Sequence, residues 1–240
     1  MAIKKSASST GVAKPPITAW SYSRLSTYNE CPAKFKFKNI DKLPEPAGPA
    51  MARGAEIHEM ADKWVKAPKE GPLPAELSQF DVEFKQLREL KSYGLQTEMQ
   101  VAFTAGWKVT GWFDKDAWCR VILDAFVPAD MDTKTVKPID YKTGKIRGTY
   151  GEQMELYDLA GLILDPKAVK SVSELWFLDH GQIVDSSDTP VLRKDVPKLQ
   201  KKWEGKVKRL LNDTRFDPTP SGDACKYCHF KKSNGGPCQY

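Results

Sequence analysis

Residues Val121–Gly144, with the sequence VILDAFVPADMDTKTVKPIDYKTG, decide the fold of this chain. They contain two short apolar runs on either side of a polar turn. The first run, Val121–Val127, is too short for a typical helix and has the composition of a buried strand. Asp130–Lys134 turn the chain, and Val136–Tyr141 returns as a second strand. The stretch therefore predicts a β-hairpin.

Each strand of this hairpin carries an acid, Asp124 in the first and Asp140 in the second. Side by side, two carboxylates repel each other unless a cation lies between them. Carboxylate oxygens suit a hard divalent ion such as Mg²⁺ or Mn²⁺. Lys142 follows Asp140 by two residues, so its side chain points to the same face. Two acids and a lysine around one ion make a site for phosphodiester hydrolysis. The alternative is a set of ordinary strand-end charges with a surface ion pair.

Length and composition are those of one large domain with an appendage. The 240 residues are 40% hydrophobic, which allows a full core. Residues 1–18 are rich in Ser, Lys and Pro, which predicts a disordered tail before a domain at 19–240. The net charge of +6 permits a nucleic-acid partner without requiring one. No apolar run reaches membrane length and the N-terminus lacks a signal-peptide core, so we expect a cytoplasmic protein with no membrane partner.

The remaining periodicity predicts helices and further strands around the hairpin. Ser21 is a typical N-cap for a short helix that ends near Pro32. Strand-like alternation covers residues 98–139 and begins at Glu98, a candidate further acidic contributor to the site. Further helices are expected over residues 51–66, 77–93, 150–164 and 193–212, and further strands over 172–178 and 183–184.

Two basic segments each allow two interpretations. Residues 33–38, AKFKFK, alternate basic and aromatic side chains. They could contact nucleic acid through phosphate charge and base stacking, or form a half-buried segment with a solvated face. The lysines of residues 193–212 could likewise form a solvated face or a DNA-facing stripe.

Three of the five cysteines cluster near the C-terminus, at Cys225, Cys228 and Cys238. In a reducing compartment such a cluster indicates a metal site. Cys31 would complete an all-thiolate set of the kind that an iron–sulfur cluster needs, with the two ends of the chain tied together. His229 would instead complete a local Cys₃His zinc site. The fifth cysteine lies in the strand region and is expected to be a buried thiol.

These motifs, taken in order, resemble the PD-(D/E)XK nuclease superfamily. Within it they resemble the RecB-like branch that carries an iron–sulfur cluster, which includes CRISPR-associated four-cysteine exonucleases and viral recombination exonucleases. Residues 21–32, SYSRLSTYNECP, are similar to the opening motif of that branch, and one early cysteine followed by three late ones is also its order. Gly54 and His58 match its Gly-x-x-x-His motif. Asp124 and Asp140–Gly144 match its catalytic motif, and Gln153 and Tyr157 match its Gln/Tyr motif.

The resemblance implies a restriction-endonuclease-like α/β core, in which helices flank a small mixed sheet. It also implies that residues 19–40 and 213–240 are joined by a metal cluster. The expected activity is that of a Mg²⁺- or Mn²⁺-dependent DNA exonuclease acting on a single strand or a duplex end. Its setting would be recombination, repair, or phage or CRISPR DNA processing, with recombination or CRISPR proteins as partners and a cellular or phage-encoded source.

The resemblance also implies a role for each matched residue. Lys142 would position or activate the attacking water and steady the developing negative charge, while Gln153 and Tyr157 would support the site and the DNA strand. The alternatives are a non-cleaving adaptor that binds DNA ends on the same fold, and a zinc-binding scaffold. The implied ligands of the catalytic ion are His58, Asp124, Asp140 and the backbone carbonyl of Tyr141, and those of a 4Fe–4S cluster are Cys31, Cys225, Cys228 and Cys238.

Overall fold

The predicted hairpin is the centre of the sheet. In the computed structural model, which describes residues 17–46, 48–146, 148 and 150–240, β3 (Cys119–Val127) pairs antiparallel with β4 (Thr135–Lys142). Ala125 lies opposite Ile139 in this pair. Most residues of both strands are buried, as expected for strands that helices cover on both faces.

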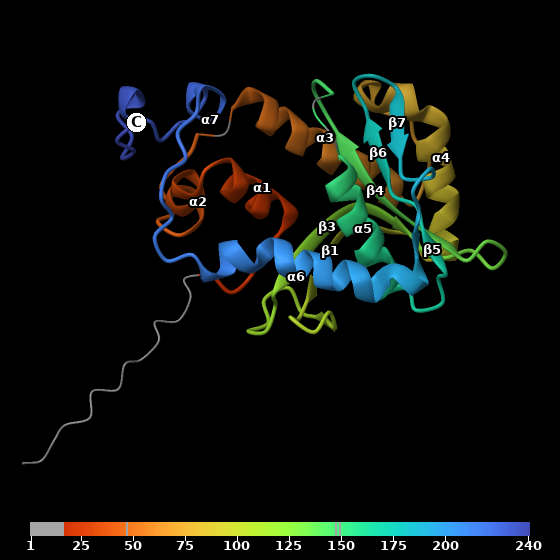
Figure 1. Cartoon of the computed structure of the whole chain (residues 1–240). Coiled ribbons are helices and arrows are strands. Elements are labelled where there is room, and N and C mark those ends of the chain that lie inside the picture. Colours follow the sequence, from red (N-terminus) through yellow and green to blue (C-terminus); the bar gives the residue numbers. More distant parts are fainter. Residues whose placement is uncertain (1–16, 47, 147, 149) are drawn as a thin grey trace, which may run out of the picture.

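Other strands extend the sheet on both sides of the hairpin (Figure 1). β1 (Gln96–Phe103) runs antiparallel to β3, whereas β6 (Glu174–Phe177) runs parallel to β4. Parallel neighbours need a crossover, and α5 (Gly151–Leu164) provides it between β4 and β6. This mixed sheet with flanking helices confirms the predicted restriction-endonuclease-like fold class. The shorter strands are β2 (Val109–Thr110), β5 (Lys170–Ser171), β7 (Gln182–Asp185) and β8 (Val191–Leu192).

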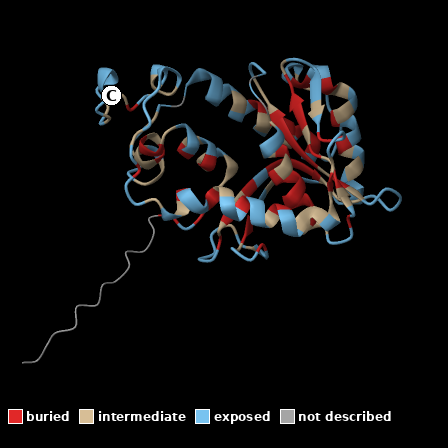
Figure 2. Ribbon diagram, in the orientation of Figure 1, coloured by how far each residue is buried: buried red, intermediate tan, exposed pale blue. Residues whose placement is uncertain are grey.

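Helices cover both faces of the sheet, and each face has its own apolar core. α3 (Pro49–Lys66) and α4 (Asp81–Glu89) pack on one face, and α5 packs on the other with α6 (Val196–Asn212) and α1 (Tyr22–Glu30). Figure 2 shows the buried residues concentrated in the strands and in α5. α6 contributes an apolar stripe at helical spacing, formed by Leu199, Trp203, Val207 and Leu210.

The helix expected over residues 77–93 is interrupted. The chain forms a 3₁₀ helix at Ala75–Phe80, then α4, then a second 3₁₀ helix at Leu90–Tyr93. Leu77, Phe80, Phe84 and Leu87, whose spacing predicted one helix, still face the apolar core beneath α3. The remaining short helices are a 3₁₀ turn at Arg193–Asp195, α7 (Gly222–Lys226) and a 3₁₀ turn at Lys232–Asn234.

The basic and aromatic segment at residues 33–38 belongs to α2 (Pro32–Asn39), where its side chains separate by face. Phe35 is fully buried and stacks on Phe216, with ring centroids 6.0 Å apart. Lys38 lies on the exposed side. The half-buried interpretation is therefore the correct one for Phe35, whose ring is not available to stack on a base.

The lysines of α6 include two that form ion pairs with α5. Lys202 Nζ lies 2.5 Å from a carboxylate oxygen of Glu155, and Lys206 Nζ lies 2.5 Å from one of Glu152. These contacts fasten the two helices to each other on one face of the sheet. They favour a structural and solvated role for this part of the lysine-rich face over a DNA-facing stripe.

The first and last segments of the described chain lie side by side (Figure 1). The hydroxyl of Tyr28 in α1 donates a hydrogen bond to Asp213, just after α6, at 2.7 Å. The hydroxyl of Thr219 donates to the carbonyl of Glu30 at 3.1 Å. The end of the chain thus holds α1 in place.

Two boundaries differ from the sequence prediction. Ile17, expected in the tail, is buried in the same apolar core as α5 and α6, so the packed chain begins no later than this residue. Residues 1–16 lie outside the described residues. Strands occur in the region 98–139 as expected, at β1, β3 and β4, but burial does not alternate along β3 and β4, and residues 104–118 form loops around the two-residue β2. In the described ranges, no helix is both long and apolar enough to cross a membrane.

Asp158 fastens α5 to the region where β5 and β6 begin. Its carboxylate is 1% exposed and accepts hydrogen bonds from the hydroxyls of Ser171 at 2.7 Å and Ser173 at 3.1 Å. Burial raises the pKa of Asp158 to about 6, although the serine hydrogen bonds favour the charged form. The folded protein therefore keeps a proton on Asp158 at pH values where the unfolded chain has released it.

We expect Asp158 to lower the free energy of unfolding as the pH rises from about 4 to about 6, because over this range the folded state binds more protons than the unfolded state. Asp158→Asn removes this titration. The difference in unfolding free energy between the variant and the wild type should therefore change by about 3 kcal/mol between acidic and neutral pH. Urea unfolding at several pH values measures it, with the exposed Asp188→Asn as the control. A difference that stays constant with pH would contradict the assignment.

Candidate active site

The catalytic-core motif lies where the pairing of β3 with β4 stops. The paired register ends at Ala125 and Ile139, one residue short of Asp124 and Asp140. At this point a side chain replaces the backbone partner, since the N–H of Tyr141 donates to Asp124 Oδ2 at 2.5 Å. Both aspartates are buried, at 6% and 8% exposure. The hairpin thus brings the two acids into the same small region, as the sequence predicted.

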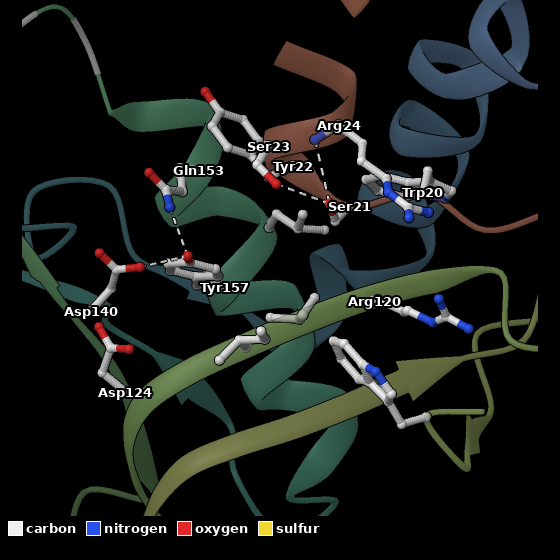
Figure 3. A pocket seen from close by; sticks show the side chains of 14 residues that line it. Trp20, Ser21, Tyr22, Ser23, Arg24, Arg120, Asp124, Asp140, Gln153 and Tyr157 are labelled. Carbon is white, nitrogen blue, oxygen red and sulfur yellow. Dashed lines mark hydrogen bonds between the residues drawn. The ribbon is translucent and has the colours of Figure 1, made fainter. Parts of the chain in front are cut away.

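A chain of hydrogen bonds from α5 holds Asp140 (Figure 3). The side-chain amide of Gln153 donates to the hydroxyl of Tyr157 at 2.6 Å, and this hydroxyl donates to Asp140 Oδ1 at 2.7 Å. Lys142 Nζ lies 2.6 Å from the other carboxylate oxygen, Oδ2. Gln153 and Tyr157 are one helical turn apart and therefore share the face that meets the end of β4. Both oxygens of Asp140 are fixed by side chains that the sequence had singled out.

His58 and Glu98 approach Asp124 from other elements. His58 Nδ1, on α3, lies 3.1 Å from Asp124 Oδ1. The candidate ligand atoms of His58, Glu98 and Asp124 all lie within 4.8 Å of one another. In the part of the chain that the structure describes, no other group of three or more His, Cys, Asp or Glu side chains is this compact. These three residues form a group that could hold a metal ion.

Glu98 reaches this group through an unusual backbone conformation in β1. Its φ is +50°, in the left-handed region that a residue other than glycine seldom adopts. The preceding residue, Thr97, pairs with Ala125 in regular register, so Glu98 lies across from Asp124. Such conformations cost roughly 1–3 kcal/mol each and cluster at functional sites. The structure thus places beside Asp124 the acid that the sequence offered as a further contributor.

The crowding of acids changes their protonation equilibria. Burial and then repulsion by Asp124 raise the pKa of Asp140, and Lys142 opposes this effect. The same two causes raise the pKa of Glu98. Burial lowers the pKa of His58, but its hydrogen bond to Asp124 and the surrounding negative charge together raise it more. A divalent cation among these groups would offset the repulsion and favour the ionised acids.

Gly54 lets α3 bring His58 close to the end of β4. It lies one helical turn before His58, on the same face. A Cβ at Gly54 would lie 3.1 Å from the hydroxyl oxygen of Thr143, which is tighter than ordinary van der Waals contact. Close packing against Thr143 therefore explains why a glycine stands at this position of the Gly-x-x-x-His motif.

Asp179 was missed by the sequence analysis and fastens the loop after β4. Its carboxylate accepts two hydrogen bonds from the Arg53 guanidinium, at 2.6 and 2.9 Å, and one from the N–H of Gly144 at 2.6 Å. Gly144 has a φ of +79°, which only glycine adopts easily. In the sequence, Asp179 is marked only by its position directly after the strand predicted at residues 172–178. That position does not indicate which residues it contacts. Its contacts join α3 to the Asp-x-Lys loop.

The cysteines of the predicted cluster lie together. Cys119 is not among them, because it is fully buried in the core and burial raises the pKa of its thiol. His229 does not line the pocket that the other cysteines share. The cysteines that line this one pocket are Cys31, Cys225, Cys228 and Cys238.

The site combines buried acids on adjacent strands, which a cation would stabilise, with an ion-paired lysine beside them. This combination is typical of a metal-dependent hydrolase. A comparison with family models agrees with this class. The chain belongs to the PD-(D/E)XK nuclease superfamily, whose model matches residues 19–233. Members of this superfamily are nucleases and usually use Mg²⁺ or Mn²⁺.

No curated protein matches the chain. One of the similar solved structures is titled "Crystal structure of SSO0001"; it has a TM-score of 0.36 and 16% sequence identity, and the match covers 89% of this chain and 84% of that chain.

We expect Mn²⁺ to bind the wild-type protein and to raise its thermal unfolding temperature, because the ion relieves the repulsion among the acids. At an Mn²⁺ concentration of about 100 times Kd the stabilisation should be about 2.7 kcal/mol. Asp124→Asn should lose most of the binding, whereas the exposed Asp188→Asn should keep it. Calorimetric titration and thermal unfolding with and without Mn²⁺ measure both effects. Equal Mn²⁺ affinity in Asp124→Asn and wild type would show that the ion lies elsewhere.

Proposed function

We propose that this protein is a Mg²⁺- or Mn²⁺-dependent deoxyribonuclease that hydrolyses phosphodiester bonds from DNA ends. The observation that carries the proposal is the ion pair of Lys142 with Asp140 beside the buried Asp124. Superfamily membership supports the reaction class. The preference for DNA ends, and a setting in recombination, repair, or phage or CRISPR DNA processing, are supported by the resemblance to the RecB-like branch.

The side chains present fit a hard divalent ion. Asp124, Asp140 and His58 would hold it together with the carbonyl of Tyr141. Of these, Asp124 and His58 already form a compact group with Glu98, which is within reach as a further acid. When bound, such an ion supplies Lewis-acid stabilisation of the phosphate and lowers the pKa of a coordinated water. His58 already contacts Asp124, and Tyr157 already orients Asp140. His58, Glu98 and Asp124 would therefore need little rearrangement to share an ion, which is the condition for strong electrostatic catalysis.

Lys142 would act on the attacking water and on the negative charge that develops at the phosphate. Its ammonium lies at the same end of β4 as Asp140 and has three donor hydrogens. One can stay with Asp140 while the others meet water and a phosphate oxygen. Gln153 and Tyr157 are positioning residues in this scheme, because they fix the direction of the Asp140 carboxylate.

We also propose that Cys31, Cys225, Cys228 and Cys238 bind a 4Fe–4S cluster that joins residues 19–40 to residues 213–240. All four thiols line one pocket, which supports a single metal group that they share. An all-thiolate set is the ligand set that an iron–sulfur cluster needs.

We expect Asp124→Asn and Asp140→Asn each to reduce DNA cleavage in Mn²⁺ by at least about a thousandfold, because each removes a charged ligand at the reacting phosphate. Lys142→Gln should also be severely impaired, whereas Asp188→Asn should cleave like the wild type. The substrates are a linear DNA labelled at one end and a closed circle of the same sequence. Cleavage of the linear form alone supports an exonuclease, and cleavage of the circle would show an endonuclease. Binding of ends by the wild type without any metal-dependent product would instead favour the non-cleaving adaptor.

We expect anaerobically purified protein to be brown, to absorb near about 400 nm and to contain iron and sulfide, because thiolate-bound clusters have charge-transfer bands. Cys31→Ser should lose the colour, since it removes the only ligand from the N-terminal segment. His229→Ala should keep it. A colourless protein that contains zinc, with zinc lost in His229→Ala, would replace the cluster by a Cys₃His site.

A further inference from the structure

A cleft of about 280 Å³ leads from the catalytic acids to the N-terminal end of α1 (Figure 3). Asp124 and Asp140 line it at one end. Figure 3 shows Arg24 and Arg120 on the side away from these acids, and both also line the cleft. The cleft therefore has a negative end at the site of chemistry and a positive end beyond it.

The two arginines lie near each other, and among the described residues neither has a carboxylate partner. Burial and then the positive charge of Arg120 lower the pKa of Arg24. The arginine–carboxylate ion pairs of the described residues involve Arg53 and Arg215, and neither cleft arginine takes part in one. In the same part of the chain, Arg120 Nε is buried without a hydrogen-bond partner. Buried donors are almost always satisfied, so this arrangement points to an anion that completes it.

The surrounding contacts fix both side chains but leave donors available. One terminal nitrogen of Arg24 donates to the carbonyl of Ala19 at 3.1 Å. The Arg120 guanidinium lies over the ring of Trp112, 5.4 Å from its centroid. Each guanidinium has five N–H donors, so most remain free for an oxyanion. Planar, oriented guanidinium groups are well suited to phosphate.

We propose that Arg24 and Arg120 together bind a phosphate of the same DNA strand that is cleaved at Asp124 and Asp140. The inference rests on the proposed nuclease function. A phosphate between the arginines would remove their mutual repulsion and satisfy the buried Nε of Arg120. Arg120 precedes Asp124 by four residues on β3, which is about 13 Å along a strand. The bound phosphate is therefore not the one that is cleaved, and its distance from the acids sets where along the strand cleavage falls.

The test is DNA binding by the full chain in EDTA, where no cleavage occurs, at several salt concentrations. Arg24→Gln and Arg120→Gln should each weaken binding of a single-stranded oligonucleotide roughly tenfold. Each should also reduce the slope of log K against log salt by about 0.7, the value for one lost phosphate contact on a single strand. Arg215→Gln makes the same change of charge at a side chain that is 80% exposed, and should match the wild type.

Three oligonucleotides distinguish the possible sources of the phosphate: one with a 5′-phosphate, one with a 3′-phosphate and one with neither. If the glutamine variants lose affinity for only one of the phosphorylated oligonucleotides, the arginines bind a terminal phosphate. If they lose affinity equally for all three, the arginines bind an internal phosphate. Arg24→Lys and Arg120→Lys keep the charge and should recover most of the slope, which separates loss of charge from misfolding.

Wild-type affinity and slope in both glutamine variants would overturn the proposal, and would leave the nuclease assignment intact if the wild type still cleaves DNA in Mn²⁺. The converse result also separates the two ideas. A wild type that binds DNA with the predicted arginine dependence but never cleaves it would keep the phosphate site and overturn the nuclease.

Discussion

The hydrogen bond from the Tyr141 amide to the Asp124 carboxylate is the contact on which the rest of the site depends. It replaces a main-chain bond at the point where β3 and β4 separate, so the sheet keeps a partner for a buried N–H while it opens. The same bond places the carboxylate of Asp124 beside the end of β4 that carries Asp140.

The residues around this opening come from both helical layers. α3 supplies His58 from one face of the sheet, and α5 supplies Tyr157 from the other. Each layer is fastened by polar contacts as well as by its apolar core. Exposed contacts of Asp179 join α3 to the loop after β4, and the buried carboxylate of Asp158 joins α5 to the strands beyond. The geometry of the site is therefore set by the packing of the whole domain, and a local segment alone would not reproduce it.

The sequence predicted best what depends on local spacing. Asp140 and Lys142 share a strand face because they are two residues apart, and Gln153 and Tyr157 share a helix face because they are four apart. The hairpin followed from the two apolar runs, and the matched motifs correctly joined His58 to Asp124. In contrast, the left-handed conformation of Glu98, the bond between Asp179 and Arg53, and the proximity of Arg24 and Arg120 depend on contacts between distant segments, and no periodicity reports such contacts. The interruption of residues 77–93 is of the same kind, because the apolar spacing is compatible with both one helix and three short ones.

The placement of α1 has a consequence for the order in which the protein matures. α1 forms one wall of the cleft, yet Asp213 and Thr219 hold it through hydrogen bonds, and Trp203 holds the residues just before it by stacking on Trp20. These partners emerge from the ribosome nearly two hundred residues after α1, so a nascent chain can form the hairpin with its acids well before the wall is in place. This wall of the cleft can therefore form only after residues 203–219 have been synthesised and have packed against the N-terminal segment.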